Sequence, residues 1–299
     1  LGTPTTDAQR FMLAALTARQ QMRESGFLGR VLAREEYGYL KDDYENLLRA
    51  GNVSESDFDH TGRLRMRDPR TGIMWAALDH GHWGTKLQRS SDNGATWTEV
   101  EAPKFPEGAV INTGFPGGES STKPATLSYI WLIAPGGADQ PQRLYLGTEP
   151  GGLFQSDDGG ESFSLVETLW DRPERLSWWF GGGRDYPGLC SICVDPRNSN
   201  HVIVGISCGG VYETRDGGES WDARNKGLSA NYLPDPYSEF GHDPHYMLMS
   251  PANPDILWMQ NHCGVFRSAD SAATWQDVSQ NGGPAYFGFP VVTDRNDPD

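Results

Sequence analysis

One eight-residue pattern occurs four times in this chain of 299 residues, and it constrains the fold more than any other feature. The pattern is Ser/Thr-x-Asp-x-Gly-x-Ser/Thr-Trp/Phe, and its copies begin at residues 90, 156, 214 and 268. The fourth copy has Ala272 in place of the glycine. Repeats spaced by tens of residues are typical of stacked supersecondary units, and each interval here has room for four short strands and a loop.

The pattern is typical of a closed turn between two strands. An aspartate side chain can accept hydrogen bonds from the backbone N–H groups that follow it, and glycine adopts a positive φ without strain. We therefore expect Asp92, Asp158, Asp216 and Asp270 to hold hairpins together rather than to act in catalysis. Apolar segments with Gly- and Pro-rich turns surround each copy, and they predict antiparallel strands.

The four copies resemble the Asp-box (BNR) repeats of sialidases, sortilin-type receptors, the photosystem II assembly factor and some xyloglucanases. The resemblance extends over residues 62–299 and is nearest to bacterial BNR-repeat or glycosyl-hydrolase-like proteins. It implies an all-β fold, a β-propeller of four-stranded antiparallel blades with Asp-box hairpins. It does not imply sialidase activity, because the arginines of this chain do not match the triad with which sialidases hold the substrate carboxylate.

We expect two parts in the chain. Residues 62–299 form the propeller, in which about five blades are visible and the last, with a strand at Phe289–Thr293, is incomplete. A second chain or a dimer is expected to complete the ring, since open sheet edges invite pairing. Residues 1–61 form a short N-terminal helical extension, with helices over Asp7–Glu24 and Leu40–Ala50. This extension is expected to cap the propeller, and a partner-binding arm is the alternative.

Composition excludes two classes of partner. The formal net charge is −15 and no cluster of Lys and Arg is present, which excludes a nucleic-acid ligand. No apolar run is long enough to span a membrane.

Cys190 and Cys193 fall on a predicted strand, where residues three apart point to opposite faces and cannot share a disulfide or a metal. Buried, reduced thiols favour the cytoplasm over secretion.

Antiparallel connectivity sorts the loops of each blade onto two faces. The Asp boxes connect the third and fourth strands, so the second-to-third turns and the loops between blades lie on the opposite face, which we call the loop face. Five histidines fall there, and we expect them to bind a transition metal such as Zn, Cu or Fe, with Cys263, Glu149 or Asp243 as further ligands. In the alternative, the imidazoles bond turn backbones and stack on neighbouring rings. The five are His80, His82, His242, His245 and His262.

The loop face also carries carboxylates and aromatic rings. A glycosidase needs two carboxylates across a sugar-sized cleft, and the catalytic candidates are Asp243, Glu149, Asp185 and Glu239. The ligand-binding candidates are Trp83, Trp178, Trp179, Arg184, Tyr186, Tyr237, Cys208 and Cys263. The alternative for the rings is simple packing in the core.

Three functions follow from these groups. We favour a propeller enzyme with a His-lined, metal-dependent site that acts on a small molecule or a glycan. The second hypothesis is a glycoside hydrolase or lyase that uses the loop carboxylates. The third is a non-catalytic scaffold that binds a protein or a glycan.

Overall fold

The structure is a computed structural model that describes residues 65–80, 84–118, 121–279, 283 and 285–298. The chain divides into two compact units, Leu1–Arg67 and Asp68–Asp299. Only the end of the first unit is described, with strand β1 at Arg65–Arg67. The helices predicted over Asp7–Glu24 and Leu40–Ala50 lie outside the described residues.

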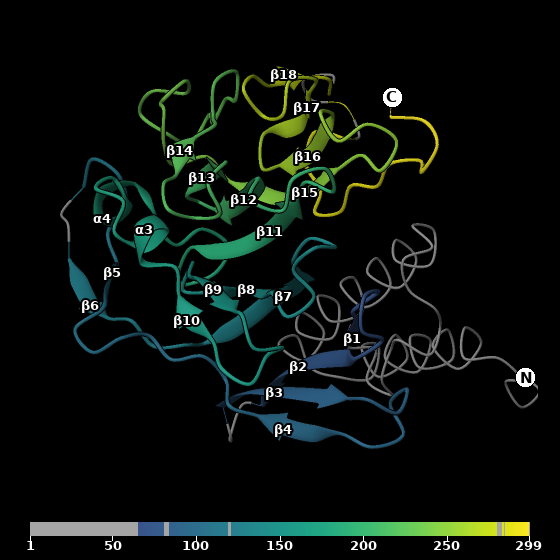
Figure 1. Cartoon of the computed structure of the whole chain (residues 1–299). Helices are drawn as coiled ribbons and strands as arrows, with labels where there is room; N and C mark the ends of the chain where they lie inside the picture. Colours follow the sequence, from purple (N-terminus) through teal and green to yellow (C-terminus); the bar gives the residue numbers. More distant parts are fainter. Residues whose placement is uncertain (1–64, 81–83, 119–120, 280–282, 284, 299) are drawn as a thin grey trace, which may run out of the picture. The chain divides into compact units, whose positions relative to one another are not determined.

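The second unit is a succession of antiparallel sheets (Figure 1). Its N-terminal sheet contains β2 (Met74–His80), β3 (Gly84–Ser90) and β4 (Thr98–Val100). The next sheet contains β7 (Tyr129–Pro135), β8 (Leu144–Glu149), β9 (Leu153–Ser156) and β10 (Ser164–Leu165). It is followed by β11 (Gly188–Val194), β12 (Val202–Ser207), β13 (Gly210–Thr214) and β14 (Asp222–Ala223). The last sheet contains β15 (Pro244–Met249), β16 (Leu257–Asn261), β17 (Gly264–Ser268) and β18 (Gln276–Asp277).

Strands that are consecutive in sequence are hydrogen-bonded neighbours in each of these sheets. The prediction of an all-β fold with four-stranded antiparallel sheets is therefore confirmed. The number of blades and the closure of a ring stay predictions.

Helix is almost absent from the described part of the chain. A small hairpin of β5 (Val110–Asn112) and β6 (Thr122–Pro124) precedes the second sheet. The loop between the second and third sheets contains two short helices, α3 (Glu167–Trp170) and α4 (Arg175–Trp178), which the sequence pattern did not predict. Neither is long enough to cross a membrane, and no other helix in the described residues is either.

The core lies between neighbouring sheets. Every residue of β8 and of β13 is buried, and β11 packs against both β8 and β15. Tyr145 of β8, Leu189 of β11 and Val204 of β12 belong to one buried cluster. The inner strands are covered on both faces, which explains why they read as nearly continuous apolar runs.

Each turn motif is closed by the same hydrogen bonds. In the third copy, Asp216 Oδ1 accepts from Thr214 Oγ1 at 2.7 Å and from the backbone N–H of Ser220 at 2.9 Å. Thr214 Oγ1 in turn accepts from the N–H of Gly218 at 2.9 Å. The same bonds recur around the other three aspartates, Asp92, Asp158 and Asp270. These aspartates are therefore structural in the way that their sequence predicted.

The fourth copy keeps this pattern without its glycine. The N–H of Ala272 donates to Ser268 Oγ at 2.9 Å, although the φ of Ala272 is 66°. An alanine in this region carries strain that a glycine avoids. The bonds to Asp270 and Ser268 outweigh that strain.

A buried ion network lies at the same end of the third sheet. His201 is placed between Asp195 Oδ2, at 2.9 Å from Nδ1, and Glu213 Oε1, at 2.7 Å from Nε2. Arg215 and Arg224 also contact Glu213, at 2.7 and 2.6 Å. The hydrogen bond to Glu213 raises the pKa of His201, against the opposing effect of burial.

One strand prediction is wrong. Residues Phe289–Thr293 form no strand, because no described strand lies beside them to pair with. This part of the chain contacts side chains of the fourth sheet. The Phe289 ring stacks on the His245 ring at 4.7 Å, and further along the carbonyl of Pro298 accepts from Trp258 Nε1 at 2.8 Å. This segment therefore packs along the fourth sheet without forming a strand.

The turn motifs predict a stability cost for Asp270→Ala. The substitution removes the acceptor of three hydrogen bonds, and we expect the free energy of unfolding to fall by about 1–3 kcal/mol. Urea unfolding checks this, with Glu219→Gln as the control, because Glu219 is an exposed carboxylate in the preceding motif. An Asp270→Ala protein as stable as the control would contradict the structural role.

The His201 network predicts a pH-dependent contribution. A histidine whose folded-state pKa lies above its ordinary 6.5 stabilises the fold fully below that value, and the contribution is lost as pH rises through the raised pKa. We expect His201→Leu to cost about 3 kcal/mol at low pH and distinctly less at high pH. Urea unfolding of both proteins at pH 6 and pH 9 measures the difference. A cost that is equal at the two pH values would show that His201 is neutral in the folded protein.

Candidate functional site

The two ends of each sheet carry different connections. The turn between β11 and β12 contacts the turn motif of the same sheet, since the N–H of Gly217 donates to the carbonyl of Asn200 at 2.9 Å. The second-to-third turns lie at the other end, and they carry Glu149, Cys208 and His262. The loop face defined from the sequence is therefore one physical end of these sheets.

Asp243 is the centre of a side-chain cluster on the loop face. Its Oδ1 accepts from Ser207 Oγ at 2.7 Å and from the N–H of Cys208 at 3.1 Å. Its Oδ2 lies 3.3 Å from His245 Nε2 and 3.4 Å from His262 Nδ1. We call Asp243, His245 and His262 the Asp–His cluster; one ligand atom from each lies within 4.8 Å of the others.

A β-bulge and a turn bring these three residues together. The register between β15 and β16 shifts between Pro244 and Tyr246, so His245 is the extra residue of the bulge. Bulges re-aim side chains at sheet ends. The N–H of His262 donates to the backbone carbonyl of Asp243 at 3.0 Å, which ties the turn after β16 to the start of β15.

The cluster is electrostatically coupled. Burial opposes the ionisation of Asp243, but hydrogen bonds to His245 and His262 hold the pKa of this carboxyl below its usual range. Burial also opposes a charge on His245, and the hydrogen bond to Asp243 nevertheless raises the pKa of His245. The carboxylate form of Asp243 is thus the stable one in the fold.

Aromatic rings line the cluster. His245 stacks on Phe289 with an interplanar angle of 16°. The edge contacts of His262 are with Phe287 and Tyr232, at centroid distances of 5.1 and 5.3 Å. The His245 side chain is only 6% exposed and that of His262 is 44% exposed, so the cluster opens to solvent on the His262 side.

The glycine-rich segment 181–185, which we call the glycine loop, lies directly against this cluster. All five residues are exposed. A Cβ added to Gly182 would lie 2.4 Å from Cys208 Sγ and 3.9 Å from Asp243 Oδ2. The backbone therefore approaches Cys208 so closely that only glycine fits.

The other side of the glycine loop forms a second polar site. The Arg184 guanidinium contacts Glu149, whose side chain is 3% exposed, and it also lies 4.9 Å above the ring of Tyr129. Burial raises the pKa of Glu149 although the contact with Arg184 opposes this, and the charge of Asp185 raises it further. Glu149, Arg184 and Asp185 thus form one electrostatic group, the Glu149 site.

The predicted ligand-binding rings differ in their surroundings. Trp179 is 2% exposed and donates from Nε1 to the Tyr212 hydroxyl at 2.9 Å, so it belongs to the core. Trp178 packs near Phe240, at a centroid distance of 6.1 Å. Tyr186 carries the ammonium of Lys123 above its ring, and Tyr237 is 77% exposed.

Three further predicted residues lie outside the Asp–His cluster: His242, Cys263 and Glu239. His242 is buried, donates from Nε2 to the carbonyl of Ser238 at 2.7 Å, and has its pKa lowered by burial. The thiol of Cys263 contacts Asn231 Oδ1 at 3.3 Å, and Glu239 is an exposed loop residue. His80 ends β2.

His82 and Trp83 lie outside the described residues, and so do the surroundings of the His80 side chain. The structure therefore brings two of the five predicted histidines together, with Asp243 between them. Asp243 was predicted both as a catalytic carboxylate and as a further metal ligand beside the imidazoles.

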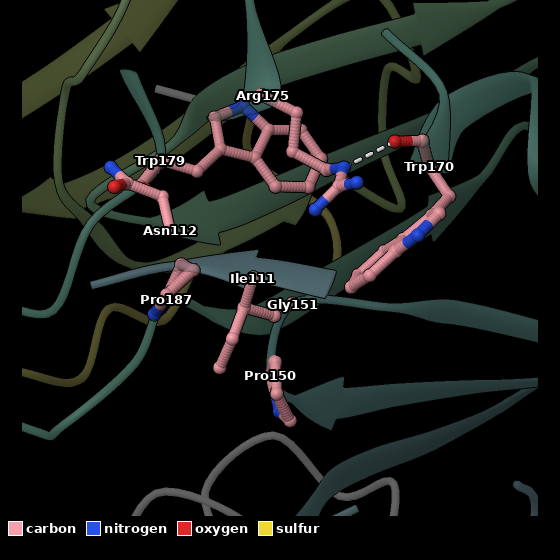
Figure 2. Close-up of a pocket in the computed structure, with 8 residues that line it drawn as sticks. All are labelled: Ile111, Asn112, Pro150, Gly151, Trp170, Arg175, Trp179 and Pro187. Atoms are coloured by element: carbon pink, nitrogen blue, oxygen red, sulfur yellow. Dashed lines mark hydrogen bonds between the residues drawn. The ribbon is translucent and has the colours of Figure 1, made fainter. Parts of the chain in front are cut away.

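A buried arginine was missed by the sequence interpretation. Arg175 lines a small pocket with Asn112, Trp170 and Trp179 (Figure 2). Its Nη1 donates to the carbonyl of Val110 at 2.7 Å, and the guanidinium lies 3.9 Å above the Trp170 ring. The pocket volume of about 10 Å³ has room for no more than one water, so this group braces the hairpin instead of binding a sugar. Arg175 directly precedes the apolar and aromatic residues of segment 176–180, and this neighbourhood in the sequence indicates burial.

Comparison with known proteins gives partial matches to xyloglucanases. No family model matches the chain. An oligoxyloglucan-reducing end-specific xyloglucanase of Emericella nidulans is 35% identical over 81 residues, which is 27% of this chain and 9% of that protein. A xyloglucanase of Hypocrea jecorina is 26% identical over 223 residues, 67% of this chain and 24% of that protein. The chain spans about a quarter or less of the length of these relatives.

Solved structures with some similarity include an ancestral GH74 enzyme and the GH74 xyloglucanase of Xanthomonas campestris. The first is 18% identical, with a TM-score of 0.49, over 74% of this chain and 24% of that one. The second is 19% identical, with a TM-score of 0.46, over 73% of this chain and 30% of that one.

The close approach at the glycine loop predicts a contrast between neighbouring glycines. Gly182→Ala places a methyl group against Cys208, and we expect it to lower the free energy of unfolding by about 1–3 kcal/mol. Gly183 has no atom within 4 Å of an added Cβ, so Gly183→Ala should change it by less than about 0.5 kcal/mol. Equal effects in urea unfolding would contradict the contact with Cys208.

Proposed function

We propose that this chain contributes the glycan-binding face of a glycoside hydrolase, with the Glu149 site as its polar centre. The observation that carries the proposal is the pairing of a buried carboxyl, Glu149, with an exposed one, Asp185, beside a glycine loop. The names of the curated relatives support a glycan as ligand and xyloglucan as the first to test.

The two carboxyl groups have the environments that glycosidic cleavage requires. One carboxylic acid must hold a proton to give to the leaving oxygen, and a second, ionised group must activate water or attack the sugar. Burial, together with the charge of Asp185, raises the pKa of Glu149. Asp185 is exposed and has access to water. We assign the acid role to Glu149 and the base role to Asp185.

Arg184 regulates access to the acid. Its side chain is 48% exposed and lies over Glu149, so a bound sugar can displace the guanidinium from the carboxyl. When the guanidinium leaves, the pKa of Glu149 loses the contribution that lowers it. Ligand binding would then favour the protonated acid at the position where a proton is needed.

Aromatic rings next to the site suit a sugar ligand. Tyr129 lies beneath Arg184, and Tyr186 lies beneath the Lys123 ammonium. The ring faces of these two tyrosines now contact cationic side chains, and they can stack on sugar rings when the cations move. Glycine at positions 181–183 lets the ligand approach the backbone.

The proposal predicts binding and cleavage of xyloglucan oligosaccharides. We expect Glu149→Gln to keep binding, because the amide preserves the shape, and to lower the hydrolysis rate by about 100-fold or more. Arg184→Ala should weaken binding. Calorimetry measures the binding and reducing-end release measures the hydrolysis, with Glu219→Gln as the matched control on the opposite end of the sheets.

Two outcomes decide against this assignment. If the protein binds no xyloglucan, cellulose or mixed-linkage glucan oligosaccharide, the glycan-binding face is wrong. If hydrolysis occurs and survives Glu149→Gln and Asp185→Asn together, the catalytic carboxyls lie elsewhere. Binding without hydrolysis in the unaltered protein would support only the third hypothesis, a non-catalytic glycan-binding scaffold.

A further inference from the structure

We propose that the Asp–His cluster is a site for a divalent transition-metal ion, held by Asp243, His245 and His262. This site is separate from the Glu149 site, and it does not depend on the proposed glycan activity. Its ligands are two imidazole nitrogens and one carboxylate oxygen, a donor set that suits Zn²⁺, Fe²⁺ or Cu²⁺ and leaves coordination positions open for water or a ligand.

A backbone carbonyl determines which nitrogen of the His245 ring faces Asp243. Its Nδ1 lies 2.6 Å from the backbone carbonyl of Gly288, and a carbonyl only accepts, so Nδ1 holds the proton. In the neutral ring, Nε2 then presents a lone pair. That lone pair faces Asp243 Oδ2, another lone-pair donor, at 3.3 Å. Two acceptors in such contact repel each other unless a proton or a cation lies between them.

His262 supplies a third ligand atom at the same oxygen. Its Nδ1 faces Asp243 Oδ2 at 3.4 Å, so both imidazoles converge on one carboxylate oxygen. All three ligand atoms lie within 4.8 Å of one another. A tetrahedral ion at about 2.1 Å from each ligand sets those ligands about 3.4 Å apart. The two measured separations from Asp243 Oδ2, 3.3 and 3.4 Å, match this spacing.

The surroundings hold the ligands as a metal site requires. Asp243 Oδ1 is fixed by Ser207 Oγ and the N–H of Cys208, which leaves Oδ2 directed at the imidazoles. The Gly288 carbonyl sets the ring orientation of His245. Such outer contacts orient the ligands and tune the affinity of metal sites. The Phe289 ring stacks on His245 and the Phe287 ring contacts the edge of His262, so both imidazoles are packed against rings.

Metal titration of the untagged protein tests the proposal. Zn²⁺ and Co²⁺ should bind in a one-to-one ratio by calorimetry, and Co²⁺ should develop visible absorption bands. We expect His262→Ala to weaken Co²⁺ binding by about 100-fold or more, with unchanged circular dichroism because its side chain is partly exposed. Asp243→Asn should weaken it similarly. Cys263→Ser, which alters the residue next to His262, should bind as the unaltered protein does.

A second readout follows the protonation of His245 Nε2. When Zn²⁺ binds, the ¹⁵N resonance of His245 Nε2 should move to that of a metal-bound nitrogen. Glu149→Gln should leave Zn²⁺ affinity unchanged, which separates this site from the proposed glycan site. The proposal is overturned if neither ion binds, if His262→Ala binds as tightly as the unaltered protein, or if His245 keeps protons on both nitrogens in excess Zn²⁺.

Discussion

Antiparallel pairing allows the connections of a four-stranded sheet to leave from only two ends, and this constraint determines at which end of the described sheets each connection lies. First-to-second turns and turn motifs share one end. Second-to-third turns and the loops between sheets share the other. The hydrogen bonds within the turn motifs make the constraint stable, because Asp92, Asp158, Asp216 and Asp270 satisfy turn N–H groups that would otherwise compete with the strands.

A bulge in the first strand of the second, third and fourth sheets adds a local variation. The register shifts around Trp131 in β7, around Cys190 in β11 and around His245 in β15. The bulge is the same in these three strands, but the side chain at its extra position differs. Cys190 contacts the backbone carbonyl of Pro244, whereas His245 contacts Asp243. A repeated backbone feature therefore supplies a fixed position at which sequence changes create different chemistry.

The repeated parts of the fold were predictable and the local parts were not. Periodic apolar strands and the Asp motifs predicted the sheets because those interactions are local in sequence. The separation of His242 from His245 was not predictable, because it depends on the bulge that follows Asp243. Pairing of Glu149 with Arg184 joins residues 35 positions apart, which no local pattern encodes. The wrong strand at Phe289–Thr293 has the same cause: apolar alternation indicates a strand only where a neighbour is present to pair with.

The buried carboxylates at the two ends of the sheets have different sets of partners. At the turn end, Asp68 and Asp195 each accept from a backbone N–H and from the side chain of the same arginine, Arg70 or Arg197. These contacts are local, charge-assisted and permanent, because arginine does not lose its proton.

At the loop end, the buried carboxylates have partners that can change. Glu149 depends on a half-exposed arginine of a glycine-rich loop. Asp243 faces two imidazoles, one of them open to solvent. Imidazole is the side chain whose charge and ligands alter most readily near neutral pH. A buried carboxylate that is held by displaceable or titratable partners is costly as a structural device, since its burial is compensated only while those partners stay in place. At the turn end, Asp195 and Glu213 also contact the titratable His201, but that imidazole is buried and each carboxylate contacts an arginine as well. At the loop end, the glycine loop brings solvent and ligands to the carboxylates.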